Sequence, residues 1–182
     1  MNLSDTIVTV SSASGGVRSI IRLTGPEVYA VCEQVFTPCP IRPSNGIQTG
    51  SVAIDPDLAV DAHLYLFVAG HSYTGEPLAE IHLEASPILV ETLVQNLLTR
   101  GLRPAGPGEF TARAYLNGKL DLAQAEAVNE IIASSNRFQL DGAERLLRGR
   151  LSQSAGAVRL ALLDCLSLIE AGLDFSDESI EF

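Results

Sequence analysis

The sequence has no tryptophan, a single methionine and only 5% aromatic residues among its 182 residues. The core must therefore be built mainly from alanine, leucine, isoleucine and valine. Hydrophobic residues make up 46% of the chain, which excludes general disorder. At roughly 100 to 200 residues per domain, this length predicts one or two compact domains.

Basic side chains are also scarce. The 12 Lys and Arg residues are outnumbered by 22 Asp and Glu residues, and the formal net charge is -10. The overall field therefore repels nucleic acid and anionic membranes, and any contact with a polynucleotide would need a local basic patch. Lys119 is the only lysine.

Cysteine is too rare to form a disulfide framework. The three cysteines, Cys32, Cys39 and Cys165, have no C-x-x-C spacing, so neither a disulfide scaffold nor a zinc knuckle is indicated. No window approaches the roughly 20 uncharged residues of a membrane span, and the N-terminus lacks the features of a signal peptide. We expect a soluble protein of the reducing cytoplasm.

Two common kinds of site are missing from the sequence. The only Gly-Lys pair, Gly118-Lys119, is followed by leucine, so there is no phosphate-binding loop of the Walker type. The histidines His63, His71 and His82 share no metal-ligand spacing. His82 lies on the same strand face as Glu80, and we expect it to pack or to form a hydrogen bond.

The first two thirds of the chain mix strand and helix patterns. We expect two strands within residues 5–23 around a loop at 11–16, a helix opened by Pro26, strands at 47–54, 63–68 and 78–83, a helix from Ser86-Pro87 to Gly101, and a short helix at 109–117. The turn signals between them are Gly-Pro, Asn-Gly and Asp-Pro pairs.

The pattern becomes wholly helical from Asp121, which can cap the first of two helical stretches; the second runs over residues 137–173. Two such stretches cannot bury all of their apolar faces against each other, so this part needs further helices, the first domain or another subunit. The sequence thus predicts an α+β fold: a mixed α/β domain over residues 1–118, then the long helices of an incomplete helical domain over residues 119–182.

Three polar residues stand beside structural breaks. Arg22 lies at the end of an apolar strand, Glu80 interrupts another strand, and Lys119 follows the glycine that ends a short helix. They are either solvated or paired with one another, or they bind a heterocycle with a donor edge and an anionic tail. A carboxylate accepts from ring N–H groups, while Arg and Lys hold carboxylates.

One segment is far more specific than any periodicity. Residues 107–127 read PGEFTARAYLNGKLDLAQAEA. This run closely resembles the signature of the tRNA modification GTPases called MnmE or TrmE. Further matches keep the family's order: Asp5-Thr6-Ile7, the run IIRLTG from Ile20, the run SYTGE from Ser72 leading to Glu80, and the closing Asp174-Phe175 and Ile180-Glu181-Phe182.

The resemblance implies a first domain similar to the folate-binding fold of aminomethyltransferases, followed by the opening helices of a helical domain. It implies that this first domain forms a homodimer and binds 5-formyltetrahydrofolate as a one-carbon donor. Carried over by motif, the folate-binding residues are Arg22, Glu80 and Lys119. We expect no catalytic residue and no metal ligand in this chain.

The same resemblance implies partners outside this chain. The family acts with the flavoprotein MnmG on the wobble uridine of certain tRNAs. GTP, magnesium and potassium belong to a GTPase domain that is missing here, so the chain resembles a fragment that is not catalytic by itself.

The chain also departs from the family pattern. Residues 11–14 read SSAS in place of a Pro-rich, Arg-containing loop, Glu84-Ala85-Ser86 replaces a His-Gly-Gly run, and Gly106 replaces an arginine. These changes favour an alternative, a dimerisation or partner-recruitment module without folate. A third reading is a stand-alone aminomethyltransferase-like enzyme, whose only candidate acids would be Glu80 and Asp121.

Overall fold

The computed structural model describes residues 4–12, 17–39 and 44–174. The chain separates into two compact units, Met1–Leu120 and Asp121–Phe182. The first is mixed α/β and the second is helical, which confirms the predicted fold class. The division after Leu120 lies close to the predicted one after Gly118.

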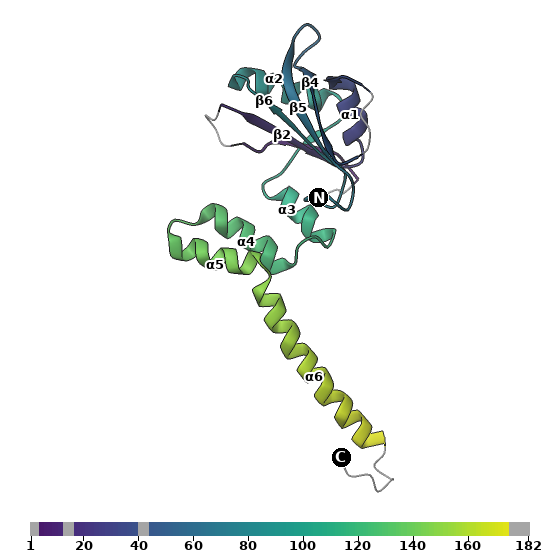
Figure 1. Cartoon of the computed structure of the whole chain (residues 1–182), viewed down its shortest axis with the longest axis vertical. Helices are drawn as coiled ribbons and strands as arrows, with labels where there is room; N and C mark the ends of the chain where they lie inside the picture. Colours follow the sequence, from purple (N-terminus) through teal and green to yellow (C-terminus); the bar gives the residue numbers. More distant parts are fainter. Residues whose placement is uncertain (1–3, 13–16, 40–43, 175–182) are drawn as a thin grey trace. The chain divides into compact units, whose positions relative to one another are not determined.

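The first unit is built on a seven-stranded sheet in the order β3-β4-β5-β6-β2-β1-β7 (Figure 1). The strands are β1 Ile7–Val10, β2 Ser19–Thr24, β3 Phe36–Thr37, β4 Gly46–Ala53, β5 Ala59–Phe67, β6 Leu78–Leu83 and β7 Arg103–Pro104. All neighbours are antiparallel except β1 and β7, which run parallel.

Most of the predicted elements are confirmed, with three corrections. Strand β5 begins at Ala59 rather than His63. The two-residue strands β3 and β7 were missed because proline, which interrupts a strand pattern, follows the first and ends the second. Helix α1 spans Val28–Val35, so Pro26 precedes the helix instead of occupying its first position.

One face of the sheet is covered by two helices, α1 and α2, the latter spanning Pro87–Thr99. Their buried stripes pack on the inward residues of the central strands. The stripes consist of Val28, Val31, Cys32, Val35, Val90, Leu93 and Leu97. This layer forms the main hydrophobic core, and burial raises the pKa of the Cys32 thiol to about 12.

On the opposite face, among the described residues of the first unit, helix α3, which spans Glu109–Leu116, packs at one end. Its Phe110 joins Ile7 and Leu78 in a second, smaller apolar cluster. Opposed residues of antiparallel strands share a face, so the next rows of this face carry Arg22 and Glu80, then His82. Arg22, Glu80 and His82 are therefore on the side of the sheet away from α1 and α2.

A buried arginine joins α3 to the sheet. The side chain of Arg113 is fully buried, and its Nη2 lies 2.5 Å from Asp5 Oδ1 and 3.3 Å from Glu109 Oε1. Its Nη1 lies 3.0 Å from Glu76 Oε2. Three carboxylates from three separate segments thus surround one guanidinium, an arrangement that compensates the cost of burying the charge.

A second arginine extends this network. Arg103 Nη2 lies 2.6 Å from Glu109 Oε1, and Arg103 Nε lies 2.8 Å from Asp5 Oδ2. The backbone N–H of Gly106 donates to Glu109 Oε2 at 2.8 Å. The hydrogen bond from Arg103, with smaller contributions from Gly106 and Arg113, outweighs burial and lowers the pKa of Glu109 to about 2.

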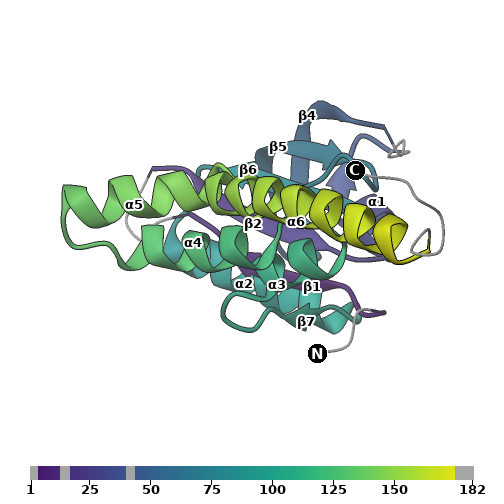
Figure 2. The same cartoon turned by 90° about the horizontal axis from the view of Figure 1, so that it is seen from below.

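The second unit contains three helices, α4 Leu122–Ala133, α5 Arg137–Leu147 and α6 Arg150–Asp174. Asp121 caps α4 as predicted: its side chain accepts from the backbone of Gln124, and the Gln124 side chain accepts from the backbone of Asp121. Helices α4 and α5 lie side by side (Figure 2). The stretch 137–173 is helical as predicted, but it forms two helices, because Gly149, one of the glycines that weaken its helical pattern, adopts a φ of +75° and separates α5 from α6.

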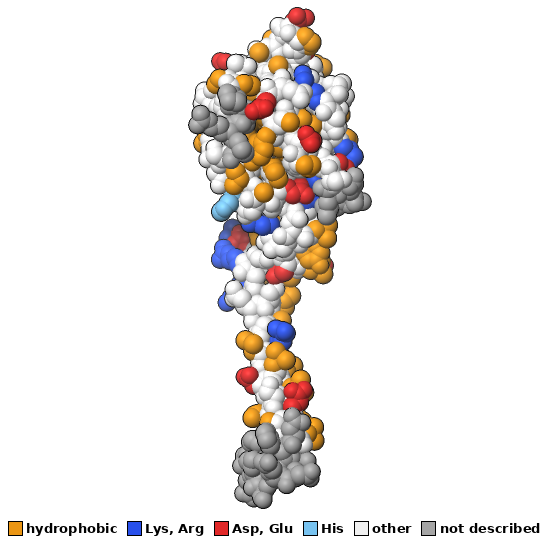
Figure 3. Space-filling model, turned by 90° about the vertical axis from the view of Figure 1, so that its right-hand side faces the viewer, with side chains coloured by type: hydrophobic (Ala, Val, Ile, Leu, Met, Phe, Trp, Pro, Cys, Tyr) orange, Lys and Arg blue, Asp and Glu red, His pale blue; other side chains and the backbone are white. Residues whose placement is uncertain are grey.

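Helix α6 has exposed hydrophobic side chains along most of its length (Figure 3). They are Leu151, Val158, Leu160, Leu162, Leu163, Leu166, Leu168, Ile169 and Leu173. No helix within the described ranges is long and apolar enough to cross a membrane.

The fully buried Arg113 predicts a large loss of stability when the charge is removed. Arg113→Met removes the cation that Glu76, Asp5 and Glu109 share, and leaves Arg103 to pair with Asp5 and Glu109. We expect the free energy of unfolding of the first unit to fall by about 3 to 5 kcal/mol. The four tyrosines all lie in the first unit, so urea unfolding followed by tyrosine fluorescence reports that unit alone.

Arg18→Met is the matched control. Arg18 is an exposed arginine of the first unit, so we expect its replacement to change the free energy of unfolding little. Arg113→Lys keeps the charge but loses the planar guanidinium, and its stability should lie between those of the two Met variants. Equal losses in Arg113→Met and Arg18→Met would contradict the structural role given to Arg113.

The low pKa of Glu109 predicts acid sensitivity. Its folded pKa of about 2 lies below the ordinary value of 4.5, so its stabilisation is complete above pH 4.5 and is lost as the pH falls towards 2. Glu109→Gln should lower stability at neutral pH and flatten its dependence on pH below 4.5. Urea unfolding at a series of pH values measures this, and an unchanged slope in the variant would refute it.

Candidate functional site

Arg22 and Glu80 form an ion pair on the less covered face of the sheet. Strands β2 and β6 are antiparallel neighbours, and their register places the two residues directly opposite each other. Glu80 Oε1 accepts from Arg22 Nε at 2.8 Å and from Nη2 at 2.7 Å. The Arg22 guanidinium also lies 5.9 Å from the centre of the Phe110 ring. The structure therefore brings two of the three predicted site residues into contact.

His82 occupies the other oxygen of the same carboxylate. Its Nε2 lies 2.9 Å from Glu80 Oε2, which confirms the predicted hydrogen-bonding role. The ring centres of His82 and Tyr65 are 4.2 Å apart. The alternation of side chains along β6 explains the contact, since residues two apart lie on one face.

The charge on Glu80 is well supported. Burial by itself raises the pKa of this carboxyl, but the hydrogen bond from His82 and the charge of Arg22 outweigh it, so the pKa lies below its ordinary value. Glu80 is therefore an ionised acceptor at neutral pH, with 16% of its side chain exposed.

Lys119 is held at a neighbouring loop. Its Nζ donates to the carbonyl of Gly70 at 2.9 Å, not to Glu80. Gly75, in the same loop, has a φ of +81°, and a Cβ there would lie 3.3 Å from Lys119 Cγ. Asn117 Nδ2 donates to the carbonyl of Thr74 at 2.7 Å. The loop and the end of α3 thus fix each other, and glycine is needed where they meet.

The same loop is tied to the strand that carries Arg22. Thr24 Oγ1 lies 2.7 Å from Thr74 Oγ1, and both side chains are fully buried. Glu76, two residues further on, pairs with Arg113. The segment that holds Lys119 is therefore anchored to β2 and to the charge network beneath α3.

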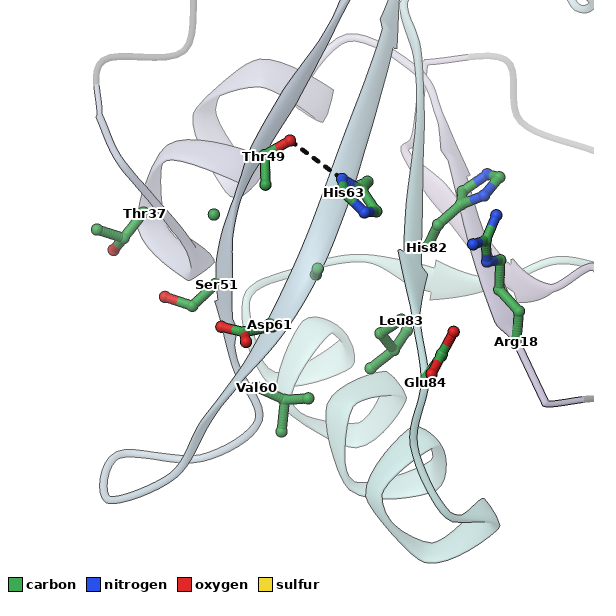
Figure 4. A pocket seen from close by; sticks show the side chains of 12 residues that line it. Arg18, Thr37, Thr49, Ser51, Val60, Asp61, His63, His82, Leu83 and Glu84 are labelled. Atoms are coloured by element: carbon green, nitrogen blue, oxygen red, sulfur yellow. Dashed lines mark hydrogen bonds between the residues drawn. The ribbon is translucent and has the colours of Figure 1, made fainter.

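A hollow of about 810 Å³ opens beside His82 on the same sheet (Figure 4). Its walls carry charges of both signs, from Arg18, Asp61 and Glu84. His63 Nδ1 lies 3.1 Å from Thr49 Oγ1 on its wall. Within the described ranges, no three His, Cys, Asp or Glu residues are grouped as a metal site requires.

Two of the departures from the family pattern lie within the described residues. Ser86 precedes α2 as its N-cap residue, while Glu84 is exposed in the hollow. Gly106 contributes its N–H to Glu109, so this position takes part in the charge network through its backbone. Residues 13–16, including Gly15-Gly16, lie outside the described residues.

Sequence reasoning missed the charge network that supports the site. Arg113 and Glu109 stand four residues apart on α3, a spacing that signals an ion pair. Nothing local to the sequence indicates that Asp5 and Glu76 converge on the same guanidinium. Chemically, the candidate residues are an ionised acceptor, Glu80, and two cationic groups, Arg22 and Lys119, which donate within the chain to Glu80 and to the carbonyl of Gly70.

Two family models match consecutive parts of the chain. Residues 6–119 match the family described as GTP-binding protein TrmE N-terminus, and residues 122–182 match the MnmE helical domain. The two matches meet where the structure divides into its two units.

Curated relatives agree with this assignment. The chain is 38% identical to the tRNA modification GTPase MnmE of Bacteroides fragilis over 184 residues, covering 98% of this chain and 40% of the relative. It is 40% identical to that of Bacteroides thetaiotaomicron over 189 residues (98% and 40%), and 38% identical to that of Paracoccus denitrificans over 180 residues (97% and 42%). The chain thus spans about two fifths of the length of these relatives, and it belongs to the MnmE (TrmE) family, matching its N-terminal and helical regions.

Proposed function

We propose that this chain is the N-terminal module of an MnmE-like tRNA modification GTPase and that it binds 5-formyltetrahydrofolate at Arg22, Glu80 and Lys119. The observation that carries the proposal is the ionised carboxylate of Glu80, held by a partly exposed Arg22 on the face of the sheet where α3 packs at one end. In this role the folate supplies a one-carbon unit for the wobble uridine of tRNA.

The residues fit such a ligand. A pterin presents adjacent ring N–H and amino donors, and Glu80 is a carboxylate whose lowered pKa keeps it ready to accept them. Arg22 is one third exposed, and Lys119 is held at the loop before β6 by its hydrogen bond to Gly70. Both cationic side chains suit the carbonyl and carboxylate oxygens of a folate. Gly75 lets the loop lie close to Lys119.

The remaining parts of the proposal concern partners. We infer that the module forms a homodimer, that an MnmG-like flavoprotein and tRNA join in the full complex, and that GTP, magnesium and potassium act in a GTPase domain outside this chain. The three cysteines are free, which suits a cytoplasmic location. The net charge of -10 makes this module a poor primary anchor for tRNA.

One observation favours a second candidate, a dimerisation or recruitment module without folate. Both oxygens of Glu80 already have donors within the chain, from Arg22 and His82. The altered residues Glu84 and Gly106 also remove positive charge or glycine flexibility around the expected site.

Folate titration separates these two candidates. We expect saturable binding of 5-formyltetrahydrofolate to the purified chain by isothermal calorimetry. Arg22→Ala, Glu80→Ala and Lys119→Ala should each weaken binding by about tenfold or more, since a hydrogen bond to a charged group contributes about 1.5 to 3 kcal/mol.

Glu91→Ala is the matched control, because Glu91 is an exposed acidic residue on α2, which packs on the other face of the sheet. The affinity of the Glu91→Ala variant for 5-formyltetrahydrofolate should equal that of the unmodified chain. A folded chain that gives no binding would leave the folate-free module as the better assignment.

Self-association is tested separately. We expect multi-angle light scattering to give about twice the chain mass of 19.3 kDa at micromolar concentrations. A mass of 19.3 kDa at all concentrations would contradict dimerisation by this chain.

A further inference from the structure

The two oxygens of Glu80 have different neighbours. Oε1 accepts both hydrogen bonds from Arg22, and Oε2 accepts the bond from His82. A carboxylate has about four acceptor positions, two on each oxygen. The Arg22 bonds therefore fill Oε1, and one acceptor position remains, on Oε2.

A planar heterocycle with two adjacent N–H donors needs one acceptor position on each oxygen, side by side. Glu80 cannot provide this while both bonds from Arg22 remain on Oε1. Binding of such a ligand must therefore displace Arg22 at least in part, while the bond from His82 can stay.

The surroundings of the two donors agree with the displacement of Arg22 and the retention of His82. The side chain of Arg22 is 32% exposed and reaches Glu80 on a long flexible stem, whereas that of His82 is 12% exposed. The His82 ring also lies against Tyr65. His82 is thus the fixed donor, and Arg22 is the one that can swing away.

We propose that the Arg22–Glu80 ion pair is a latch that opens when a planar heterocycle with adjacent N–H donors binds, and that His82 is a positioning residue that keeps the Glu80 carboxylate in place. The released Arg22 guanidinium then pairs with an anionic or carbonyl oxygen of the same ligand. This inference rests on the proposed function, and it adds the mechanism by which that site exchanges an internal partner for a ligand.

A further detail supports the role of His82. Its Nδ1 is buried and has no hydrogen-bond partner within the described part of the chain. A buried polar atom without a partner destabilises a fold, and an aromatic hydrocarbon ring would pack on Tyr65 without that cost. The hydrogen bond from Nε2 to Glu80 is what a histidine provides at this position and a phenylalanine does not.

Two variants separate the hydrogen bond from the packing. His82→Phe keeps a ring against Tyr65 and removes the donor, while His82→Gln keeps an N–H donor and removes the ring. We expect the Kd for 5-formyltetrahydrofolate to rise about tenfold in His82→Phe. His82→Gln should recover most of this loss.

Two readouts go beyond affinity. In carbon-13 NMR titrations of the free protein, the pKa of Glu80 should rise in His82→Phe and stay low in His82→Gln, because the hydrogen bond from His82 helps to lower it. In nitrogen-15 spectra, the Nε–H signal of Arg22 should shift at saturation with folate as its bond to Glu80 opens.

The outcomes distinguish this inference from the proposed function. If the unmodified chain does not bind folate, both the proposed function and the latch are overturned. In that case the pKa of Glu80 in His82→Phe still tests whether His82 positions the carboxylate. If the unmodified chain binds, an unshifted Arg22 signal overturns the latch. Equal affinity and equal Glu80 pKa in His82→Phe overturn the positioning role.

Discussion

The fully buried guanidinium of Arg113 is the interaction on which the polar side of the first unit depends. A charge without water is tolerated only when opposite charges and hydrogen bonds surround it. Asp5 precedes the first strand, Glu76 lies in the loop before β6, and Glu109 begins α3. These distant segments have to meet for the charge to be satisfied, so α3 is held against the sheet both by this charge network and by its small apolar cluster.

That constraint reaches the candidate site through the loop before β6. Glu76 is held by Arg113, and Thr74 by Thr24, so the loop has little freedom at its base. Lys119 rests on this loop, at the carbonyl of Gly70. The candidate residues therefore stand beside a loop that is held at its base, while the Arg22 side chain is 32% exposed and the Lys119 side chain is exposed. A fixed loop beside long, partly exposed cationic side chains suits a site that must open to admit a ligand.

Much of this arrangement is predictable from sequence, for identifiable reasons. The strands and helices follow from alternation, helical stripes and turn residues, and the motif around Lys119 marks the family. The face shared by Glu80 and His82 follows from their spacing in β6. The strand register that places Arg22 opposite Glu80 depends on the tertiary structure. So does the convergence of carboxylates on Arg113. No local pattern encodes which distant strands become neighbours, so these contacts required the structure.

The pairing of β2 with β6 has a consequence for how the chain tolerates changes in length. Arg22 and Glu80 are 58 positions apart, yet only the hydrogen-bond register of two strands sets them face to face. Insertions in the β4–β5 turn leave that register untouched. Deleting one residue inside β2 would instead rotate the remaining side chains to the opposite face, sending a charge into the layer beneath α1 and α2. The β4–β5 turn can thus change in length, while the two strands must keep their residue count.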